Sequence, residues 1–399
     1  MMPNVTTISS LPGKPAGRCF GQGDWAWRCA HGVGWSNRRV RERRMKALVG
    51  VMALSAVMAA GPVLAMEGDL CPDPKEVQGF KTCADVAKAE AEGEVVVYAT
   101  NPEAAELQVL GEFAKLFPKI KPNYTRLQAG ALYAKVTAER QAKTYTVDAM
   151  QISDMGMILD FQKKNGYVRY VSPQMAAYRE EYKSRPEGYW TWGAIGPAGL
   201  AYNPNVVPAD QAPKTWEEAI DPKWTDGITV KLSTSGLQHV SWFELRGLYG
   251  PDYWKKFGEL KPKGFDSYVQ QFDRLVNQQD KIIHTAQYAG YLEWKKKGAP
   301  VGFNSPAAGL PATPETWGIP TDGPHPNAAR LFVDWYLSDL GQKAMSENLY
   351  LHSAKHGAAP PPGGEPLEKI KLLMPEDWED FLKSRTAFAK EWDRYTGLR

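Results

Sequence analysis

The sequence has no hydrophobic run long enough to span a membrane. A membrane-spanning helix needs about 20 consecutive apolar residues, whereas the longest apolar run, residues 47–60, is shorter and rich in alanine. This run follows Met45-Lys46 and precedes a stretch of small residues that ends at Ala65, which is the order of parts in a secretory signal. We therefore expect residues 45–65 to be a signal peptide that is cleaved after Ala65.

No regular apolar pattern precedes this segment. Residues 1–44 are rich in glycine, arginine and tryptophan, although a signal peptide starts at the initiator methionine. We interpret residues 1–44 as an upstream start assigned in error, with Met45 as the true initiator, so that residues 1–65 together are leader. The alternative is a twin-arginine leader that uses Arg38-Arg39 or Arg43-Arg44.

A strong excess of positive charge is also missing. The whole chain has a net charge of +3, but nine of its 48 Lys and Arg residues and only two of its 45 Asp and Glu residues lie in the leader. The mature chain then holds 39 basic and 43 acidic residues, a net charge of about −4. Since nucleic-acid-binding surfaces are basic, we expect no nucleic-acid partner.

Cysteine is scarce, and only Cys71 and Cys83 of the four cysteines follow the leader. In an exported chain such a pair is expected to form a disulfide, because the compartments outside the cytoplasm are oxidising. We predict a bridge that closes an N-terminal arm, residues 66–92. The alternative is two buried free thiols.

Sequence signatures of common enzymes are absent as well. The chain has no Gly-x-Ser-x-Gly motif, no glycine-rich phosphate loop and no His-Glu-x-x-His motif. His352 and His356 have the spacing of metal ligands on a helix, but they lie beside a proline run without a third ligand, so we interpret them as solvated. We expect neither an enzyme nor a bound cofactor or metal.

What the sequence does contain is an alternation of strand and helix patterns. Short β-branched runs predict strands at Glu94–Thr100, Lys121–Leu127 and Asp148–Ser153, and apolar residues at helical spacing follow each of them. Such alternation is typical of βαβ units with a largely parallel sheet. A second α/β series extends from Gly227 to Lys297, between extended segments at Ala194–Tyr202 and Val301–Asn304.

Two α/β series joined by two extended crossing segments predict a two-lobed α/β protein whose halves close around a ligand cleft. We expect residues 93–197 with 306–358 to form the first lobe. Residues 198–305 with 359–399 are expected to form the second lobe.

Several short motifs occur in a distinctive order along the chain. They are Glu94–Tyr98, Asp148–Asp154, Leu200-Ala201-Tyr202-Asn203-Pro204, Lys214–Trp224, Thr234-Ser235-Gly236 and His325–Ala329. In this order they resemble the periplasmic substrate-binding proteins of ABC transporters, type II topology, in the branch that includes ferric-ion-binding proteins. The resemblance covers most of Gly93–Tyr350. It implies a monomer in the periplasm that captures a small molecule and delivers it to permease subunits powered by an ATPase.

Thr234, Ser235 and Gly236 lie where a second-lobe strand gives way to a helix. Free backbone N–H groups and the positive end of the helix dipole make such a start a site for anions, and the resembled family holds an anion at this Ser-Gly start. The alternative is a serine that only caps the helix.

Thr100, Asn101 and Asp154 follow predicted parallel strands. Ligands of open α/β sheets bind at the carboxyl ends of strands, so we expect these residues in the cleft. Two interpretations of Asp154 remain open: it pairs with a ligand amine, or it caps the helix that starts at Met155.

Tyr288 and Tyr291 are candidates for ligand contact. At the position of Tyr288 the resembled ferric-binding proteins carry two adjacent tyrosines that ligate iron, and phenolates suit ferric ion. Here the neighbour of Tyr288 is Ala289, and Thr100-Asn101-Pro102 lacks the histidine of the relatives. Tyr288 would be a metal ligand only together with partners such as Tyr291 or Tyr133.

The ligand expected first is therefore a small anionic or zwitterionic organic molecule, such as a carboxylate or a phosphonate. The alternative is a ferric ion or a ferric chelate. A hydrolase or transferase on the same fold is the alternative from another class of protein.

Overall fold

The computed structural model describes residues 69–398. The expected leader, residues 1–65, and its cleavage site lie outside the described residues. Within residues 69–398, no helix is both long and apolar enough to cross a membrane.

Short apolar strands, each followed by a helix, form the first half of the main sheet. β4 pairs in parallel with β5 on one side and with β6 on the other. The elements, in chain order, are β4 (Glu94–Ala99), α2 (Glu103–Leu116), β5 (Lys121–Arg126), α3 (Ala129–Ala142), β6 (Ala149–Ile152) and α4 (Met155–Lys163). The predicted parallel βαβ arrangement is confirmed, and we call this half the first lobe.

The second lobe has the same arrangement of parallel strands and helices as the first. β9 pairs in parallel with β10 and with β11. The elements, in chain order, are β9 (Ile228–Lys231), α5 (Gly236–Tyr249), α6 (Asp252–Glu259), β10 (Lys263–Phe265), α7 (Tyr268–Val276), β11 (Ile282–Gln287), α8 (Tyr288–Lys296) and β12 (Gly302–Asn304). Because all three central strands are parallel, their carboxyl ends meet at one edge of the sheet.

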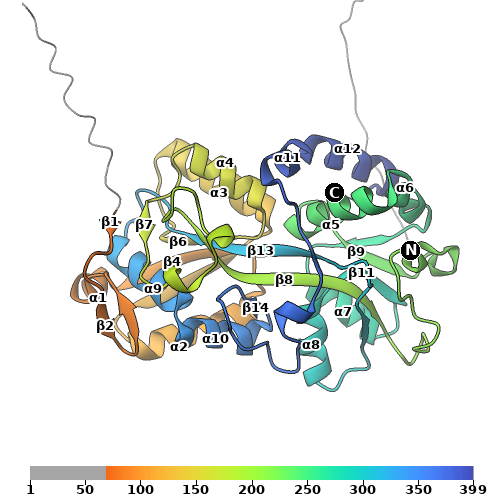
Figure 1. Cartoon of the computed structure of the whole chain (residues 1–399), viewed down its shortest axis with the longest axis horizontal. Coiled ribbons are helices and arrows are strands. Elements are labelled where there is room, and N and C mark those ends of the chain that lie inside the picture. The colour runs from red at the N-terminus through yellow and green to blue at the C-terminus, as the bar shows by residue number, and fades with distance from the viewer. Residues whose placement is uncertain (1–68, 399) are drawn as a thin grey trace, which may run out of the picture. The chain divides into compact units, whose positions relative to one another are not determined.

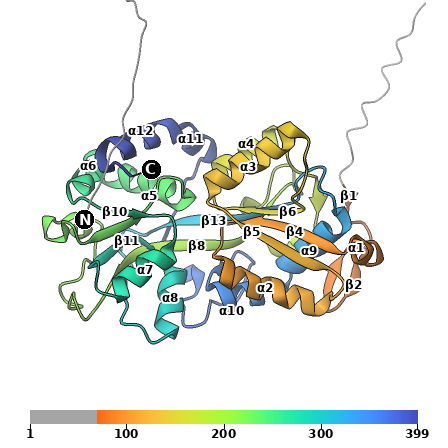
Figure 2. The same ribbon diagram turned by 180° about the vertical axis from the view of Figure 1, so that it is seen from behind.

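Two long antiparallel strands, β8 (Thr191–Tyr202) and β13 (Leu310–Gly318), run side by side through both lobes (Figures 1 and 2). β8 pairs with β13 up to Pro197 and with β11 from Ala198 onward. The segment Val301–Asn304 is not the second crossing, since β12 pairs with β8 inside the second lobe. The second crossing is β13, a few residues later in the chain.

Helices cover both faces of the sheet. In Figures 1 and 2, α3 and α4 lie on one face of the first lobe, and α2 lies on the other face with two later helices, α9 (Pro326–Leu337) and α10 (Asp339–Leu349). A short strand, β14 (His352–Ser353), then adds to β8. The first-lobe core includes Phe113, which packs edge-on against Phe332, and the second-lobe core includes Trp254 against Trp392.

The C-terminal segment contacts both lobes. It contains β15 (Leu372–Leu373), α11 (Trp378–Lys383) and α12 (Arg385–Thr396). α11 packs on α4 of the first lobe, where Lys163 pairs with Glu379 at 3.1 Å, while α12 packs on α5 and α6 of the second lobe. The sequence assigned residues 359–399 wholly to the second lobe and did not foresee this bridging position.

The N-terminal arm is attached to the first lobe by a buried polar cluster. Its elements are β1 (Asp69–Leu70), β2 (Lys75–Val77), β3 (Phe80–Thr82) and α1 (Val86–Glu92), and β1 pairs with β7 (Tyr170–Val171). The Thr82 and Tyr170 hydroxyls both donate to the buried carboxylate of Asp334, at 2.6 and 2.5 Å. Cys71 and Cys83 form the predicted disulfide, with their Cα atoms 5.5 Å apart.

Replacing both cysteines with serine should lower the melting temperature by roughly 5 °C. Closing a loop of this length stabilises the folded state by about 3 kcal/mol in the chain-entropy model, and a large chain converts this into a shift of a few degrees. Differential scanning calorimetry of the mature protein measures the shift. Wild type treated with reductant is the control and should have the same melting temperature as the variant. Equal melting temperatures of the oxidised wild type and the variant would contradict the prediction.

Candidate functional site

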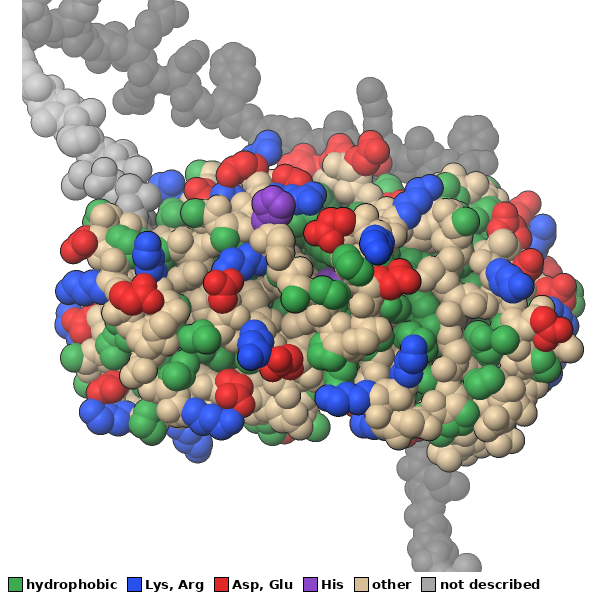
Figure 3. Space-filling view, turned by 60° about the horizontal axis from the view of Figure 1, so that its bottom comes forward, with side chains coloured by type: hydrophobic (Ala, Val, Ile, Leu, Met, Phe, Trp, Pro, Cys, Tyr) green, Lys and Arg blue, Asp and Glu red, His purple; other side chains and the backbone are tan. Residues whose placement is uncertain are grey.

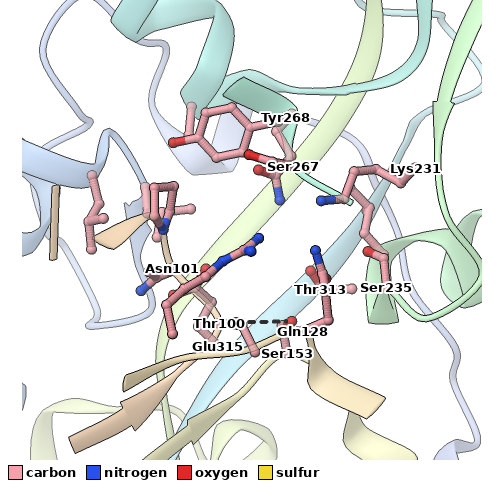
Figure 4. A pocket seen from close by; sticks show the side chains of 17 residues that line it. Thr100, Asn101, Gln128, Ser153, Lys231, Ser235, Ser267, Tyr268, Thr313 and Glu315 are labelled. Atoms are coloured by element: carbon pink, nitrogen blue, oxygen red, sulfur yellow. Dashed lines mark hydrogen bonds between the residues drawn. The ribbon is translucent and has the colours of Figure 1, made fainter. Parts of the chain in front are cut away.

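A pocket lies where the carboxyl ends of strands from the two lobes face each other (Figure 4). Including the solvent at its open mouth, it encloses about 590 Å³, but the free cavity between the side chains is only about 40 Å³ in this closed arrangement. The lining residues come from strand ends, helix starts and the crossing strand β13. They are Thr100, Asn101, Pro102, Arg126, Gln128, Ser153, Lys231, Ser235, Leu237, Ser267, Tyr268, Gln287, Ala289, Thr313, Glu315, Leu349 and Leu351.

Two cations, one from each lobe, enter the pocket. Arg126 ends β5 of the first lobe, and Lys231 ends β9 of the second lobe and is only 5% exposed. Both donate to the backbone carbonyl of Asp266, Lys231 Nζ at 2.7 Å and Arg126 Nη2 at 3.3 Å, and Gln128 donates to the same carbonyl. Burial and then the nearby charge of Arg126 lower the pKa of Lys231 to about 7. A buried cation of this kind is stabilised by an anion.

Helix starts add further positive potential to this side of the pocket. Ser235 precedes α5, and its side chain makes no capping hydrogen bond with the described residues. Ser267 precedes α7 and does cap it, accepting from the Val269 N–H at 3.2 Å. The Ser235 hydroxyl therefore remains available for a ligand, unlike that of a serine that only caps a helix.

The opposite side of the pocket is acidic. Glu315 on β13 is 6% exposed, and behind it lies Glu106 of α2, which is fully buried. Burial raises the pKa of Glu315 to about 8 and that of Glu106 to about 7. Asn101 lines the pocket and contacts both carboxyl groups. Its amide donates to Glu106 Oε2 at 2.9 Å and also forms a hydrogen bond with Glu315.

The lobes touch at the edge of the pocket. A Cβ added to Gly236 at the start of α5 would overlap the carbonyl oxygen of Ser153, which follows β6 of the first lobe. Within the first lobe, the Thr100 hydroxyl donates to the Gln151 side-chain oxygen at 2.9 Å and lies 3.3 Å from the Ser153 hydroxyl. The structure is therefore a closed arrangement of the two lobes.

Three of the residues expected from the sequence line this pocket, namely Thr100, Asn101 and Ser235. Thr234 and Gly236 flank it at the contact between the lobes. Asp154 caps α4 by accepting from the Met157 N–H at 3.2 Å and forms an ion pair with Arg385 of the C-terminal segment. The carboxylate of Asp154 is thus already paired within the protein.

The two tyrosines lie outside the lining of the pocket. Tyr288 is buried with its hydroxyl accepting from the Glu365 N–H at 3.2 Å, and its ring stacks on His352. Tyr291 is half-buried and accepts from Lys295 Nζ at 3.0 Å. Only their neighbours Gln287 and Ala289 line the pocket, because successive residues at a helix start point in different directions.

One of the two histidines departs from the expectation of solvated side chains. His352 is buried, and its Nε2 donates to the Glu365 carbonyl at 2.8 Å, whereas His356 is exposed. Within the described part of the chain, no group of three or more His, Cys, Asp or Glu side chains is arranged to hold a metal ion.

The sequence reasoning missed Arg126, Gln128, Lys231, Tyr268 and Glu315. A signal for two of them was present, since Arg126 and Lys231 end strands that the sequence predicted, and ligands bind at such ends. Glu315 carried no signal because β13 was not recognised as a strand.

Solved structures of similar fold come from periplasmic binding proteins. The chain is similar to AfuA from Actinobacillus pleuropneumoniae, solved with fructose-6-phosphate bound, with a TM-score of 0.68, 20% identity and coverage of 77% of this chain and 99% of that chain. It is also similar to iron-bound HitA from Pseudomonas aeruginosa, with a TM-score of 0.64, 19% identity and coverage of 76% of this chain and 99% of that chain. The ferric binding protein of Campylobacter jejuni is similar with a TM-score of 0.63, 15% identity and coverage of 76% of this chain and 100% of that chain.

At these identities the likeness shows a shared two-lobed α/β fold, as the sequence predicted. No curated protein matches the sequence significantly. A family profile, however, matches residues 151–384, more than half of the chain. The chain belongs to the bacterial extracellular solute-binding protein family.

Proposed function

We propose that the protein captures a small organic molecule with an anionic group by closing its two lobes and delivers it to the permease of an ABC transporter. The observation that carries the proposal is the convergence of Lys231 and Arg126, from different lobes, on one buried pocket. An anion between them would be attracted by both lobes and would therefore favour the closed form.

The hydrogen-bond inventory of the two cations supports this. A lysine ammonium has three donors and an arginine guanidinium has five. In the structure Lys231 and Arg126 each donate one hydrogen bond to the Asp266 carbonyl, and Arg126 Nη1 also lies 4.0 Å from the Asp266 carboxylate. The remaining donors, together with the Ser235 hydroxyl, match the several oxygens of a phosphate, phosphonate or carboxylate.

Among the similar solved structures, AfuA holds fructose-6-phosphate and HitA holds iron. The cationic pocket favours the first kind of ligand, since a ferric ion needs anionic ligands and is repelled by Lys231 and Arg126. The tyrosines on which iron binding would depend, Tyr288 and Tyr291, are engaged with other groups outside the pocket. We therefore place the organic anion before the ferric ion.

We further propose that the protein is exported with cleavage after Ala65, acts in the periplasm as a monomer, and has no enzymatic activity. Closure would bend β8 and β13, the two strands shared by the lobes. The lobe limits proposed are residues 93–197 with 306–358 and residues 198–305, with residues 359–399 contacting both.

Calorimetric titration with matched compounds tests the function. The panel consists of glycerol 3-phosphate and short phosphonates or carboxylates, and at least one of them should bind with micromolar or tighter affinity. The matching neutral alcohols should not bind, because Lys231 and Arg126 attract a negative partner. Native mass spectrometry of the protein as purified identifies any ligand that it carries, and this compound is then included in the titrations.

Two results would contradict the proposal. One is tight binding of ferric ion or ferric citrate, with a visible charge-transfer band, in the absence of any anion binding. The other is chemical conversion of a bound compound during incubation, which would indicate an enzyme.

A further inference from the structure

Two buried acids in the cleft have no counter-charge. Glu315 and Glu106 form no ion pair with any residue from 69 to 398, and each keeps one buried carboxyl oxygen, Oε2 and Oε1 respectively, without a hydrogen-bond partner there. Burying an unpaired polar oxygen is unfavourable. Of the two, only Glu315 lines the pocket, and its unpartnered oxygen is buried from solvent in this closed arrangement.

No cation among residues 69–398 forms an ion pair with either acid, although the charge of Arg126 acts on Tyr124 and Tyr268, as that of Glu315 does. Tyr124, Tyr268 and Tyr336 interact electrostatically with Glu315, and burial raises the pKa of each phenol, so all three stay neutral. Arg126 lies in the same pocket but makes no ion pair with Glu315 among the described contacts. Asn101 offers only its neutral amide, which favours the ionised form of both carboxyl groups.

Lys231 and Glu315 lie on opposite sides of the pocket. In Figure 4, Lys231 projects from one side, while Asn101 and Glu315 lie on the other. A ligand that places its anionic group beside Lys231 therefore presents its other end to Glu315.

We propose that Glu315, with Glu106 behind it, is a second subsite of the cleft that binds an ammonium group, so that the ligand is a zwitterion with an amine at one end and an acid at the other. This inference rests on the proposed function. The ammonium donates to the Glu315 carboxyl group and supplies the counter-charge with which that group can ionise. A neutral hydroxyl could donate as well, but it would leave the two acids without a cation.

The raised pKa of Glu315, about 8, gives the subsite a measurable signature. At pH 7 the ligand-free carboxyl is mostly protonated. A bound ammonium favours the ionised form and lowers this pKa, so the proton is released to the buffer. Anion binding takes up protons at Lys231 in both ligand series, so the signature of the subsite is that an amine releases more protons than its hydroxyl partner.

Matched pairs of ligands test the inference. Phosphoethanolamine, 3-aminopropyl phosphate and 4-aminobutyl phosphate are titrated at pH 7 against the same phosphates with a hydroxyl in place of the amine. We expect the best amine to bind about ten- to a hundredfold more tightly than its hydroxyl partner. In two buffers of different ionisation enthalpy, that amine should release up to about one proton more than its hydroxyl partner.

Glu315→Gln is the decisive variant. Glutamine has the shape of the protonated acid that the ligand-free protein holds at pH 7, so the variant should fold. It should remove both the preference for the amine and the proton release, while affinity for the hydroxyl phosphate stays within about threefold. Glu259→Gln, at an exposed position on α6, is the matched control and should behave as wild type.

The outcomes separate the two proposals. If the hydroxyl phosphates bind as tightly as the amines, or if Glu315→Gln keeps the preference for the amine, the ammonium subsite is wrong while the anion site stands. If no phosphate of either series and no other organic anion binds the wild type, both proposals are wrong.

Discussion

Replacing Lys231 with methionine should weaken the binding of an anionic ligand by about a hundredfold or more. Truncating one partner of a buried, hydrogen-bonded charge pair costs about 2–5 kcal/mol, and each 1.4 kcal/mol is a factor of about ten. Methionine keeps most of the volume of the lysine stem, so the pocket should keep its shape. Calorimetric titration of the best anion of the panel measures the loss.

The matched control is Lys281→Met, at an exposed position of the same lobe. It should leave affinity unchanged. Arg126→Met is a less clean test, because Arg126 also contacts Asp266 across the cleft and its removal would alter closure as well as ligand contact. A folded Lys231→Met protein with wild-type affinity would overturn the anion site.

The same lysine predicts a pH dependence. Because the pKa of Lys231 in the ligand-free protein is lowered to about 7, the side chain increasingly loses its proton above pH 7. An anion without an amine binds the ammonium form, so its affinity should fall by up to about tenfold per pH unit above pH 7. In Lys231→Met this decline should be absent.

Replacing Gly236 with alanine should prevent full closure of the lobes and lower affinity by roughly a hundredfold. The added Cβ would overlap the carbonyl oxygen of Ser153, and a backbone atom cannot turn aside as a side chain can. Overpacking of this kind costs about 1–3 kcal/mol, and affinity falls with the population of the closed form. The obstacle is thus a backbone carbonyl of the facing lobe.

Gly247→Ala is a matched control on the same helix, since a Cβ at Gly247 meets no atom within 4 Å. Alanine there should leave affinity unchanged and raise helix stability by up to about 1 kcal/mol. Small-angle scattering should show that saturating ligand compacts wild type and Gly247→Ala but not Gly236→Ala. Equal compaction of Gly236→Ala would show that the lobes tolerate the extra carbon.

Strands with a plain apolar pattern could be predicted from the sequence, whereas β13 could not. β4 and β6 are short apolar runs bounded by turn residues, and such local signals survive without knowledge of their neighbours. β13 contains Pro311, Pro314 and Glu315, which argue against a strand interior. It forms a strand because β8 on one side, with β6 and β15 at its two ends on the other, supplies its partners.

Some residues of the candidate site could likewise be predicted from the sequence, and others could not. Thr100, Asn101 and Ser235 were predictable because each follows a strand or begins a helix, where the direction of the chain alone brings backbone groups to the cleft. Tyr288 was a natural candidate by position, but the packing of α8 against His352 turns it away from the pocket.

By itself, the sequence determined the alternation of strands and helices, the two-lobed architecture and the cysteine pair that forms the disulfide, because these depend on local pattern and on few residues. Tertiary structure alone decided which charges share the cleft. Lys231 and Arg126 are 105 positions apart and Glu106 and Glu315 are 209 apart in the sequence, so no local pattern relates them. They meet because parallel strands of two lobes end at one cleft, and because the crossing strand β13 carries Glu315 over the buried Glu106.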